Sequence, residues 1–181
     1  MQKHAIIILA DGFEEIEAIA PIDLLRRAGI AVTTLGLTDT GVCSSHGITL
    51  TADMLLSEFT GTADALILPG GPGHKRLLES NAVIELVKTY YAENRLCAAI
   101  CAGPTVFAKA NILNGIKATC FPEYQSKLDS AVVIDSPLVI DGTIITARAA
   151  GNAIDFSLAI VHYLAGKAAM QAVAAALVYC Q

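Results

Sequence analysis

The sequence predicts an α/β protein with a flavodoxin-like, doubly wound, mostly parallel sheet and helices on both faces. Three observations support this fold class. Short β-rich runs alternate with helical patterns along the chain. The β-rich runs are apolar almost throughout, which is typical of strands that are covered on both faces. The length of 181 residues suits one domain over residues 1–181, and no repeat or linker interrupts it.

The first half of the chain is expected to supply three strands, a helix and a hairpin. In order, these are a buried strand at 4–10, a helix at 14–29, a strand at 30–37, a small hairpin at 42–51 and a buried strand at 63–71 that ends in a glycine turn. The helix ends at Gly29, with Arg26 and Arg27 favourably placed in its last turn. Pro21 predicts either a kink or a late start of this helix.

The second half continues the alternation of helices and strands. The expected elements are a helix near 81–92, a strand at 96–101, a helix at 103–110, further strands at 117–120, 131–134 and 138–146, and helices at 153–166 and 167–179. Asp141-Gly142 predicts a tight hairpin turn within the last of these strand segments. Gly166 predicts the end of the helix that begins at 153.

Composition excludes several classes of function. Apolar residues make up 54% of the chain and charged residues 16%, which predicts a large core with room for a buried subunit interface. The net charge of −5 does not favour binding of nucleic acid, and the largest cluster of basic residues along the chain is the pair Arg26–Arg27. No apolar run approaches the roughly 18 residues of a membrane-spanning helix. The short N-terminal apolar stretch is followed by acids instead of a cleavage site, so we expect a cytoplasmic protein without membrane contact.

The cysteines and histidines show no metal-binding or disulfide pattern. The five cysteines are odd in number, irregularly spaced and without a C-x-x-C pair. The four histidines are scattered, and each is expected on the surface or in packing. We therefore expect no disulfide framework and no metal site.

Parallel sheets of this kind place their ligand outside the carboxyl ends of the strands. The loops to inspect are 11–17, 69–73, 101–104 and 148–152. The residues in these loops that could take part in chemistry are Glu14, Glu15, Glu17, Gly70, Gly71 and Cys101.

The stretch AAICAGPT (98–105) contains the strongest candidate. Cys101 lies between Ala99 and Gly103, each two positions away, which is the spacing of a nucleophile elbow where a strand turns sharply into a helix. Helix N-terminal amides after the turn are expected to favour the thiolate of Cys101 and make it the most acidic thiol. The N–H of Ala102 is then placed to stabilise an oxyanion, and the backbone of Gly71 could supply a second donor.

Each candidate also has a purely structural explanation. Cys101 could be a buried structural cysteine, as is expected for Cys97, Cys120 and Cys43, but its elbow spacing favours reactivity. Gly70-Gly71 could be a plain tight turn instead of a source of amide donors. Glu14 and Glu15 are explained by the charged start of a helix.

Glu17 and His74 are the candidates for proton transfer. Glu17 lies between Ile16 and Ala18, one turn deeper than the other glutamates, and is expected to point inward. His74 follows the glycine turn and is a weak candidate for a base. Without a histidine base, Cys101 suits addition to an aldehyde, or oxidation, better than amide hydrolysis.

These motifs together resemble the ThiJ/PfpI superfamily, on the branch of the parkinsonism-associated deglycase and its bacterial YajL-type relatives. The resemblance covers essentially the whole chain. It depends on LADGFEEIEAIAPIDLLRRAGI, LPGGPG, AAICAGP, the pair Phe121-Pro122 and IDFSLAIV. It implies a flavodoxin-like homodimer with Cys101 as an oxidation-sensitive nucleophile, Glu17 as the acid beside it, and Gly71 and Ala102 as oxyanion donors.

The resemblance implies two classes of function. One is a cofactor-free enzyme that acts on reactive α-oxoaldehydes, as a glyoxalase, or on their early glycation adducts, as a deglycase. The other is a redox-sensing stress-protection protein or chaperone. A role in thiamine-precursor metabolism is suggested only by the older family name.

The sequence departs from the family pattern at two places. Phe121 stands where animal relatives carry a histidine, so base catalysis falls to Glu17. The rim loop usually written G-P-G-T is here Ala149-Ala150-Gly151-Asn152. The peptidase branch has a histidine directly after the cysteine, and Ala102 at that position argues against a protease.

Overall fold

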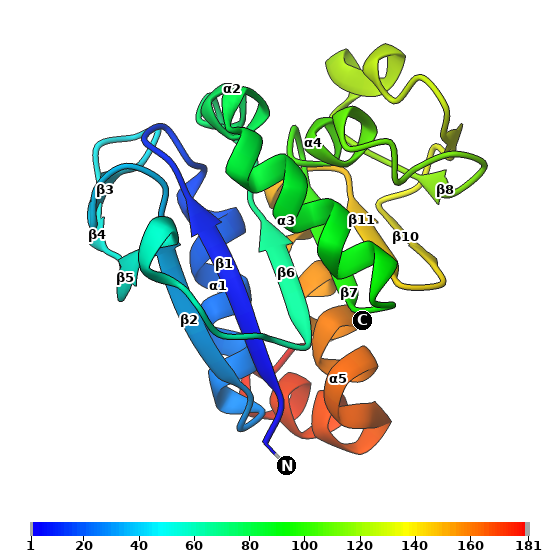
Figure 1. The fold of residues 1–181 in the computed structure, drawn as a ribbon. Helices are drawn as coiled ribbons and strands as arrows, with labels where there is room; N and C mark the ends of the chain where they lie inside the picture. Colours follow the sequence, from blue (N-terminus) through cyan, green and yellow to red (C-terminus); the bar gives the residue numbers. More distant parts are fainter. Residues whose placement is uncertain (1, 180–181) are drawn as a thin grey trace.

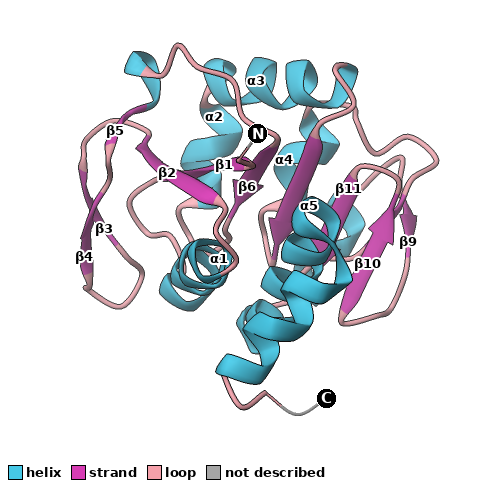
Figure 2. Ribbon diagram, turned by 90° about the horizontal axis from the view of Figure 1, so that it is seen from below, coloured by secondary structure: helices cyan, strands magenta, loops and turns pink. Residues whose placement is uncertain are grey.

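A computed structural model describes residues 2–179 and shows a seven-stranded sheet between two layers of helices (Figures 1 and 2). The strand order is β10-β11-β7-β6-β1-β2-β5. Every pairing in this sheet is parallel except β10 with β11. The predicted fold class is therefore confirmed. The strands are β1 (His4–Leu9), β2 (Ala31–Gly36), β5 (Met54–Leu55), β6 (Ala65–Leu68), β7 (Leu96–Ile100), β10 (Leu138–Asp141) and β11 (Ile144–Ala147).

Helices α1 (Glu15–Arg27) and α5 (Ala153–Ala176) cover one face of the sheet (Figure 2). Helices α2 (His74–Glu79), α3 (Asn81–Ala92) and α4 (Pro104–Lys109) lie on the other. The central strands alternate their side chains between the two layers, so β1 contributes Ile7 to the first core and Ile6 to the second. Because both layers are apolar, the central strands are buried along almost their whole length, as their continuous apolar runs predict.

Smaller elements surround the sheet. Two short pairs lie outside it: the antiparallel hairpin of β3 (Gly41–Cys43) with β4 (Thr49–Thr51), and the parallel pair of β8 (Lys117–Ala118) with β9 (Val132–Val133). The 3-10 turns are η1 (Leu56–Glu58), η2 (Pro122–Lys127) and η3 (Ala150–Asn152). The hairpin was predicted, whereas α2 and β5 were not, because each is too short to show a period.

Helix α1 is continuous through Pro21 instead of starting late. Glu14 caps its start, since its carboxylate accepts a hydrogen bond from the N–H of Glu17 at 2.8 Å. Glu17 therefore lies in the first turn of the helix, on the side that faces the sheet.

The C-terminal region forms two helical segments that meet at Gly166, as predicted. Both are included in α5, but Gly166 has φ 86° and ψ 170°, which is not helical, so a kink separates them. The segment Ala150–Ala176 is long and apolar enough to span a membrane by length and composition, contrary to the expectation that no run reaches that length. Its first half is a core helix here, with Phe156, Ile160 and Val161 buried against the sheet.

The connections place a switch point beside β1. The chain leaves β1 for β2 on one side and later returns to β6 on the other. A crevice forms outside the carboxyl ends of strands at such a point. The segments that follow β1, β6 and β7 meet there. They place Glu17, in the first turn of α1, beside Gly70 and Cys101 in the two loops.

Candidate active site

Cys101 lies at the apex of a sharp turn between β7 and α4. Its φ is +63°, in the left-handed region that non-glycine residues rarely occupy. Two hydrogen bonds hold its backbone: its N–H donates to the Ala147 carbonyl and its carbonyl accepts from the Phe121 N–H, both at 2.9 Å. The elbow that the spacing predicted is therefore present.

Bulk is excluded on both sides of the elbow. A Cβ on Gly103 would lie 2.7 Å from the Leu68 carbonyl oxygen and 3.3 Å from the Ala99 Cβ. The small residues at these two positions thus allow β6 and the start of α4 to approach each other. The same packing leaves the thiol half-buried.

Glu17 reaches the elbow from helix α1. Its side chain is fully buried, and its Oε2 accepts a hydrogen bond from the Gly70 N–H at 2.8 Å. Its Oε1 makes no hydrogen bond of standard geometry with a described residue, although the Cys101 thiol and the Ala150 backbone lie near the carboxyl. A buried carboxylate oxygen without a well-aligned donor is costly, so this oxygen favours a proton or a polar substrate atom.

The two groups influence each other's ionisation. Burial raises the pKa of Glu17 to about 7, although the Gly70 N–H acts to lower it. Burial and the neighbouring Glu17 carboxylate raise the pKa of the Cys101 thiol to about 12. The backbone N–H groups of Gly71 and Ala102 act in the opposite direction and favour the thiolate. The pair therefore carries one negative charge over a wide range above neutral pH.

This result corrects the expectation of a thiol made acidic by the following helix. Helix α4 has only six residues, and burial outweighs its effect. A thiolate would form here by transfer of the Cys101 proton to Glu17, because the amides would then stabilise the sulfur and the carboxyl would be neutral. Glu17 thus replaces the helix as the feature that controls the thiol.

The glycine turn after β6 divides its functions between two residues. Gly71 has φ +78° and directs its N–H toward the Cys101 sulfur, as does Ala102. The structure thus brings the expected donors of Gly71 and Ala102 to one atom. Gly70 differs from its expected role in substrate binding, because its N–H is already bonded to Glu17 and its carbonyl accepts from the Glu14 N–H at 3.1 Å.

His74, the weak candidate for a base, lies behind the glycine turn. It is buried, and its Nδ1 is 2.8 Å from the Gly71 carbonyl oxygen, to which it can donate a hydrogen bond. Burial lowers its pKa, so the ring is neutral near pH 7. His74 supports the turn and does not line the pocket at Cys101.

That pocket has a volume of about 230 Å³. Its lining residues are Gly71, Pro72, Lys75, Cys101, Ala102, Phe121, Glu123 and Tyr124. The sequence analysis did not select Lys75, Glu123 or Tyr124, since no motif marks them and only the path of the loops brings them to the thiol. Ala150, in the rim loop at 149–152, faces Glu17 with its backbone and acts to lower the pKa of the Glu17 carboxyl.

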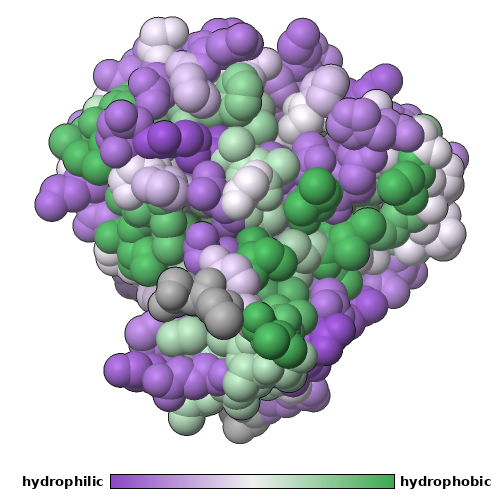
Figure 3. Space-filling model, turned by 180° about the vertical axis from the view of Figure 1, so that it is seen from behind, coloured by the Kyte–Doolittle hydropathy of each residue, from purple (hydrophilic) through white to green (hydrophobic). Residues whose placement is uncertain are grey.

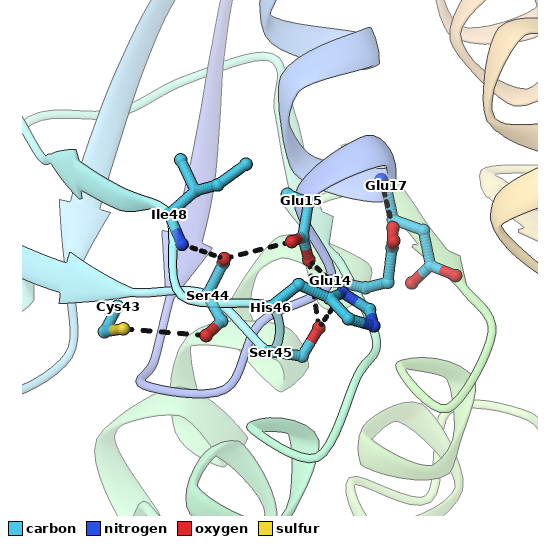
Figure 4. Close-up of polar contacts among 8 residues, drawn as sticks. All are labelled: Glu14, Glu15, Glu17, Cys43, Ser44, Ser45, His46 and Ile48. Carbon is cyan, nitrogen blue, oxygen red and sulfur yellow. Dashed lines mark hydrogen bonds and ion pairs between the residues drawn. The ribbon is translucent and has the colours of Figure 1, made fainter.

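The other glutamates of the first loop form a separate polar cluster with the β3–β4 hairpin (Figure 4). Glu15 accepts hydrogen bonds from Ser44 and Ser45 and lies 3.0 Å from the His46 ring. Desolvation opposes ionisation of Glu15, but these hydrogen bonds lower its pKa to about 2. Potential ligand atoms of Glu14, Glu15 and His46 lie within 4.8 Å of one another. The Glu15 carboxylate already interacts with Ser44, Ser45 and His46 of the hairpin, so the cluster holds the hairpin against α1.

The remaining cysteines take several positions. Cys97 and Cys120 are buried, as expected, and their pKa values are raised by burial. Cys43 is exposed on the hairpin, so its expected structural burial is wrong. The four described cysteines are free thiols, and Cys180 lies outside the described residues.

Residues 3–163 match the family model described as DJ-1/PfpI family. The chain belongs to the DJ-1/PfpI family. The resemblance found in the sequence motifs is therefore confirmed.

Several DJ-1/PfpI family members are similar to this chain. Protein dj-1beta of Drosophila melanogaster is 40% identical over 179 residues, which cover 96% of each chain. Its crystal structure superimposes with a TM-score of 0.97 at 38% identity over all of both chains. The glutathione-independent glyoxalase DJR-1.2 of Caenorhabditis elegans is 36% identical over 169 residues, 91% of this chain and 90% of that protein.

Some relatives in the DJ-1/PfpI family are longer. DJ-1 homolog B of Arabidopsis thaliana is 40% identical over 170 residues, which are 91% of this chain but 39% of that protein. The chain thus spans about two fifths of the length of that relative.

Replacing Gly70 by alanine tests the close approach of the three loops. The added Cβ would lie 2.7 Å from the Cys101 Cβ and 2.8 Å from both the Ala102 nitrogen and Glu17 Oε2. We expect a loss of about 1–3 kcal/mol in unfolding free energy, as is usual for overpacking, together with altered alkylation of Cys101. Gly151→Ala is the matched control, because its Cβ would meet open space. Equal effects of the two substitutions would contradict the packing described.

Glu17→Gln tests the ionisation of the buried carboxyl through stability. Because the folded-state pKa is raised from 4.5 to about 7, the stabilisation from protonated Glu17 is complete below pH 4.5 and is lost as pH rises through 7. Denaturant unfolding should show the variant gaining up to ~3 kcal/mol relative to wild type between pH 4.5 and 8, at 1.36 kcal/mol per pKa unit. The exposed substitution Glu79→Gln serves as control. A difference between wild type and Glu17→Gln that does not change with pH would refute the raised pKa.

Proposed function

We propose that this protein is a cysteine-dependent enzyme that acts on reactive α-oxoaldehydes, as a glyoxalase, or on their early glycation adducts, as a deglycase. One observation carries the proposal: a half-buried thiol at a strained turn lies beside a carboxyl with a raised pKa and two backbone N–H groups. The name of the Caenorhabditis elegans relative supports the same reaction class.

The first step is addition of the thiol to the aldehyde. Glu17 accepts the proton of Cys101 while the sulfur bonds to the aldehyde carbon. The developing oxyanion is stabilised by the N–H groups of Gly71 and Ala102, which already face the sulfur. Glu17 then returns this proton to the oxyanion, which gives a neutral hemithioacetal and restores the Glu17 carboxylate for the next step.

The second step moves a proton between adjacent carbons. Glu17 removes the proton from the former aldehyde carbon and returns it to the neighbouring carbonyl carbon through an enediol. The first carbon is oxidised to a thioester, and the second is reduced to an alcohol. Water then hydrolyses the thioester, so methylglyoxal yields lactate and restores the thiol. The oxygen of Glu17 that makes no hydrogen bond of standard geometry with a described residue is available for these transfers.

Methylglyoxal turnover without glutathione tests this function. Cys101→Ser should reduce lactate formation by at least ~100-fold, because a serine hydroxyl is a far weaker nucleophile at neutral pH. Glu17→Gln should remain folded and lose turnover to a similar extent, because its amide cannot accept the proton. The wild-type rate should rise with pH through about 7, as Glu17 ionises. Cys97→Ser is the control thiol substitution. Lactate formation by Cys101→Ser close to wild type would refute the proposal.

A redox-sensing role in stress protection is the second candidate, and the isolation of Cys101 favours it. Sulfinate is an anion, and the Gly71 and Ala102 amides together with protonated Glu17 would stabilise it. No other cysteine lines the pocket within the described part of the chain. Cys97 lies four residues upstream on β7, roughly 13 Å away at 3.3 Å per residue, whereas a disulfide requires less than about 7 Å.

Mild peroxide distinguishes sulfinate formation from disulfide formation. Intact mass should increase by two oxygen atoms, and peptide mapping should locate them at Cys101. Cys101→Ser should lack this addition under the same conditions. A loss of two hydrogen atoms that links Cys101 to another cysteine would contradict the described pocket.

We also propose a cytoplasmic homodimer without nucleic-acid or membrane partners. An exposed apolar surface supports association: Ile16, Ile19 and Ile48 are 54%, 41% and 51% exposed. These side chains line one hollow together with residues of α1 and α5. Figure 3 shows apolar side chains gathered on the face that carries these helices.

A further inference from the structure

The rim of the Cys101 pocket is charged. Lys75 and Glu123 line the pocket beside its two aromatic side chains, Phe121 and Tyr124. Both charged residues are exposed, and neither forms a salt bridge with a described residue. Their charges are therefore available to a molecule that enters the pocket.

Positive charge outweighs negative charge on this side of the pocket. Burial is the main cause of the lowered pKa of His74, and the positive charges of Lys75 and Lys127 lower it further. Both ammonium groups therefore lie near the His74 ring. Lys127 is also 5.5 Å from the centre of the Tyr124 ring. Two cations thus lie near the aromatic wall of the pocket, and Glu123 is the one carboxylate in the pocket lining, in a chain whose net charge is −5. Such a local excess attracts anions to a site that the whole protein would repel.

The pocket is also larger than the simplest substrate requires. Its volume of about 230 Å³ corresponds to roughly eight water molecules at ~30 Å³ each. Methylglyoxal has no group that could reach from the sulfur to the rim and pair with a charge there. An aldehyde with a longer, charged tail would use both ends of the pocket.

We propose that Lys75 makes the Cys101 pocket selective for anionic carbonyl compounds, and that its preferred substrates are α-oxoaldehydes with a terminal carboxylate. The aldehyde carbon bonds to the Cys101 sulfur while the carboxylate pairs with the Lys75 ammonium. Glu123 repels the same carboxylate and so directs it toward Lys75. The substrate class rests on the proposed function, whereas the charge selectivity of the pocket does not.

Alkylation measures the charge selectivity without any turnover. Iodoacetate and iodoacetamide transfer groups of similar size that differ by one negative charge. The ratio of their rates at Cys101, mapped by peptide mass, is compared with the ratio at the exposed Cys43 of the same molecule. Lys75→Met should lower the Cys101 ratio by about fivefold, as expected for one nearby charge at a partly solvated site, and leave the Cys43 ratio unchanged. Glu123→Gln should raise the Cys101 ratio, and added salt should reduce both effects.

Lys88→Met is the matched control, because Lys88 is paired with Glu85 on α3, away from the pocket lining. It should leave the ratio at Cys101 at the wild-type value. An equal ratio in wild type and Lys75→Met would overturn the proposal.

Turnover then tests the substrate class. The probe is 4,5-dioxopentanoate, an α-oxoaldehyde with a terminal carboxylate, and its methyl ester is the neutral control. Oxidation of the aldehyde carbon, reduction of the adjacent carbonyl and addition of one water give 2-hydroxyglutarate. Wild type should show the higher kcat/KM for the acid, and Lys75→Met should remove this preference. Equal kcat/KM for acid and ester in wild type would overturn the substrate class. If the protein converts none of the three compounds (methylglyoxal, the acid and the ester), the proposed function is refuted. The alkylation ratio would still decide the role of Lys75.

Discussion

The arrangement of the site depends on the hydrogen bond from the Gly70 N–H to the Glu17 carboxylate. It connects the first turn of α1 to the loop after β6, at a point where a side chain on residue 70 would overlap Cys101 and Ala102. The sheet order brings these loops together, because β6 lies between β1 and β7. A buried carboxyl and a half-buried thiol can therefore meet at one turn without a solvent layer between them.

This proximity determines the electrostatics. Two neighbouring acidic groups that are largely shielded from solvent cannot both ionise readily, so the second charge is strongly disfavoured. The amide donors of Gly71 and Ala102 are neutral, and they stabilise negative charge on sulfur without adding a counterion. The location of a single proton thus decides whether the negative charge lies on the Cys101 sulfur or on the Glu17 carboxylate.

The main fold and the centre of the site could be predicted from the sequence for identifiable reasons. Continuous apolar runs marked β1, β6 and β7, and the strand-end rule then directed attention to the residues that follow them. Glu17 could be selected because an acid between apolar neighbours on a helix has few explanations. By contrast, Lys75 and Glu123 reach the pocket only through the paths of α2 and η2, which no periodic pattern describes. The effect of burial on the Cys101 thiol was also missed, because the depth of the elbow depends on packing from three separate loops.

The left-handed backbone of Cys101 has a consequence for how this site can change. The conformation costs about 1–3 kcal/mol for any residue with a side chain, and the hydrogen bonds to Ala147 and Phe121 prevent its relaxation. Glycine alone would adopt it freely, yet glycine has no thiol. Backbone stability and the proposed chemistry are therefore opposed at a single torsion angle: the substitution that would best suit the backbone would also remove the sulfur atom.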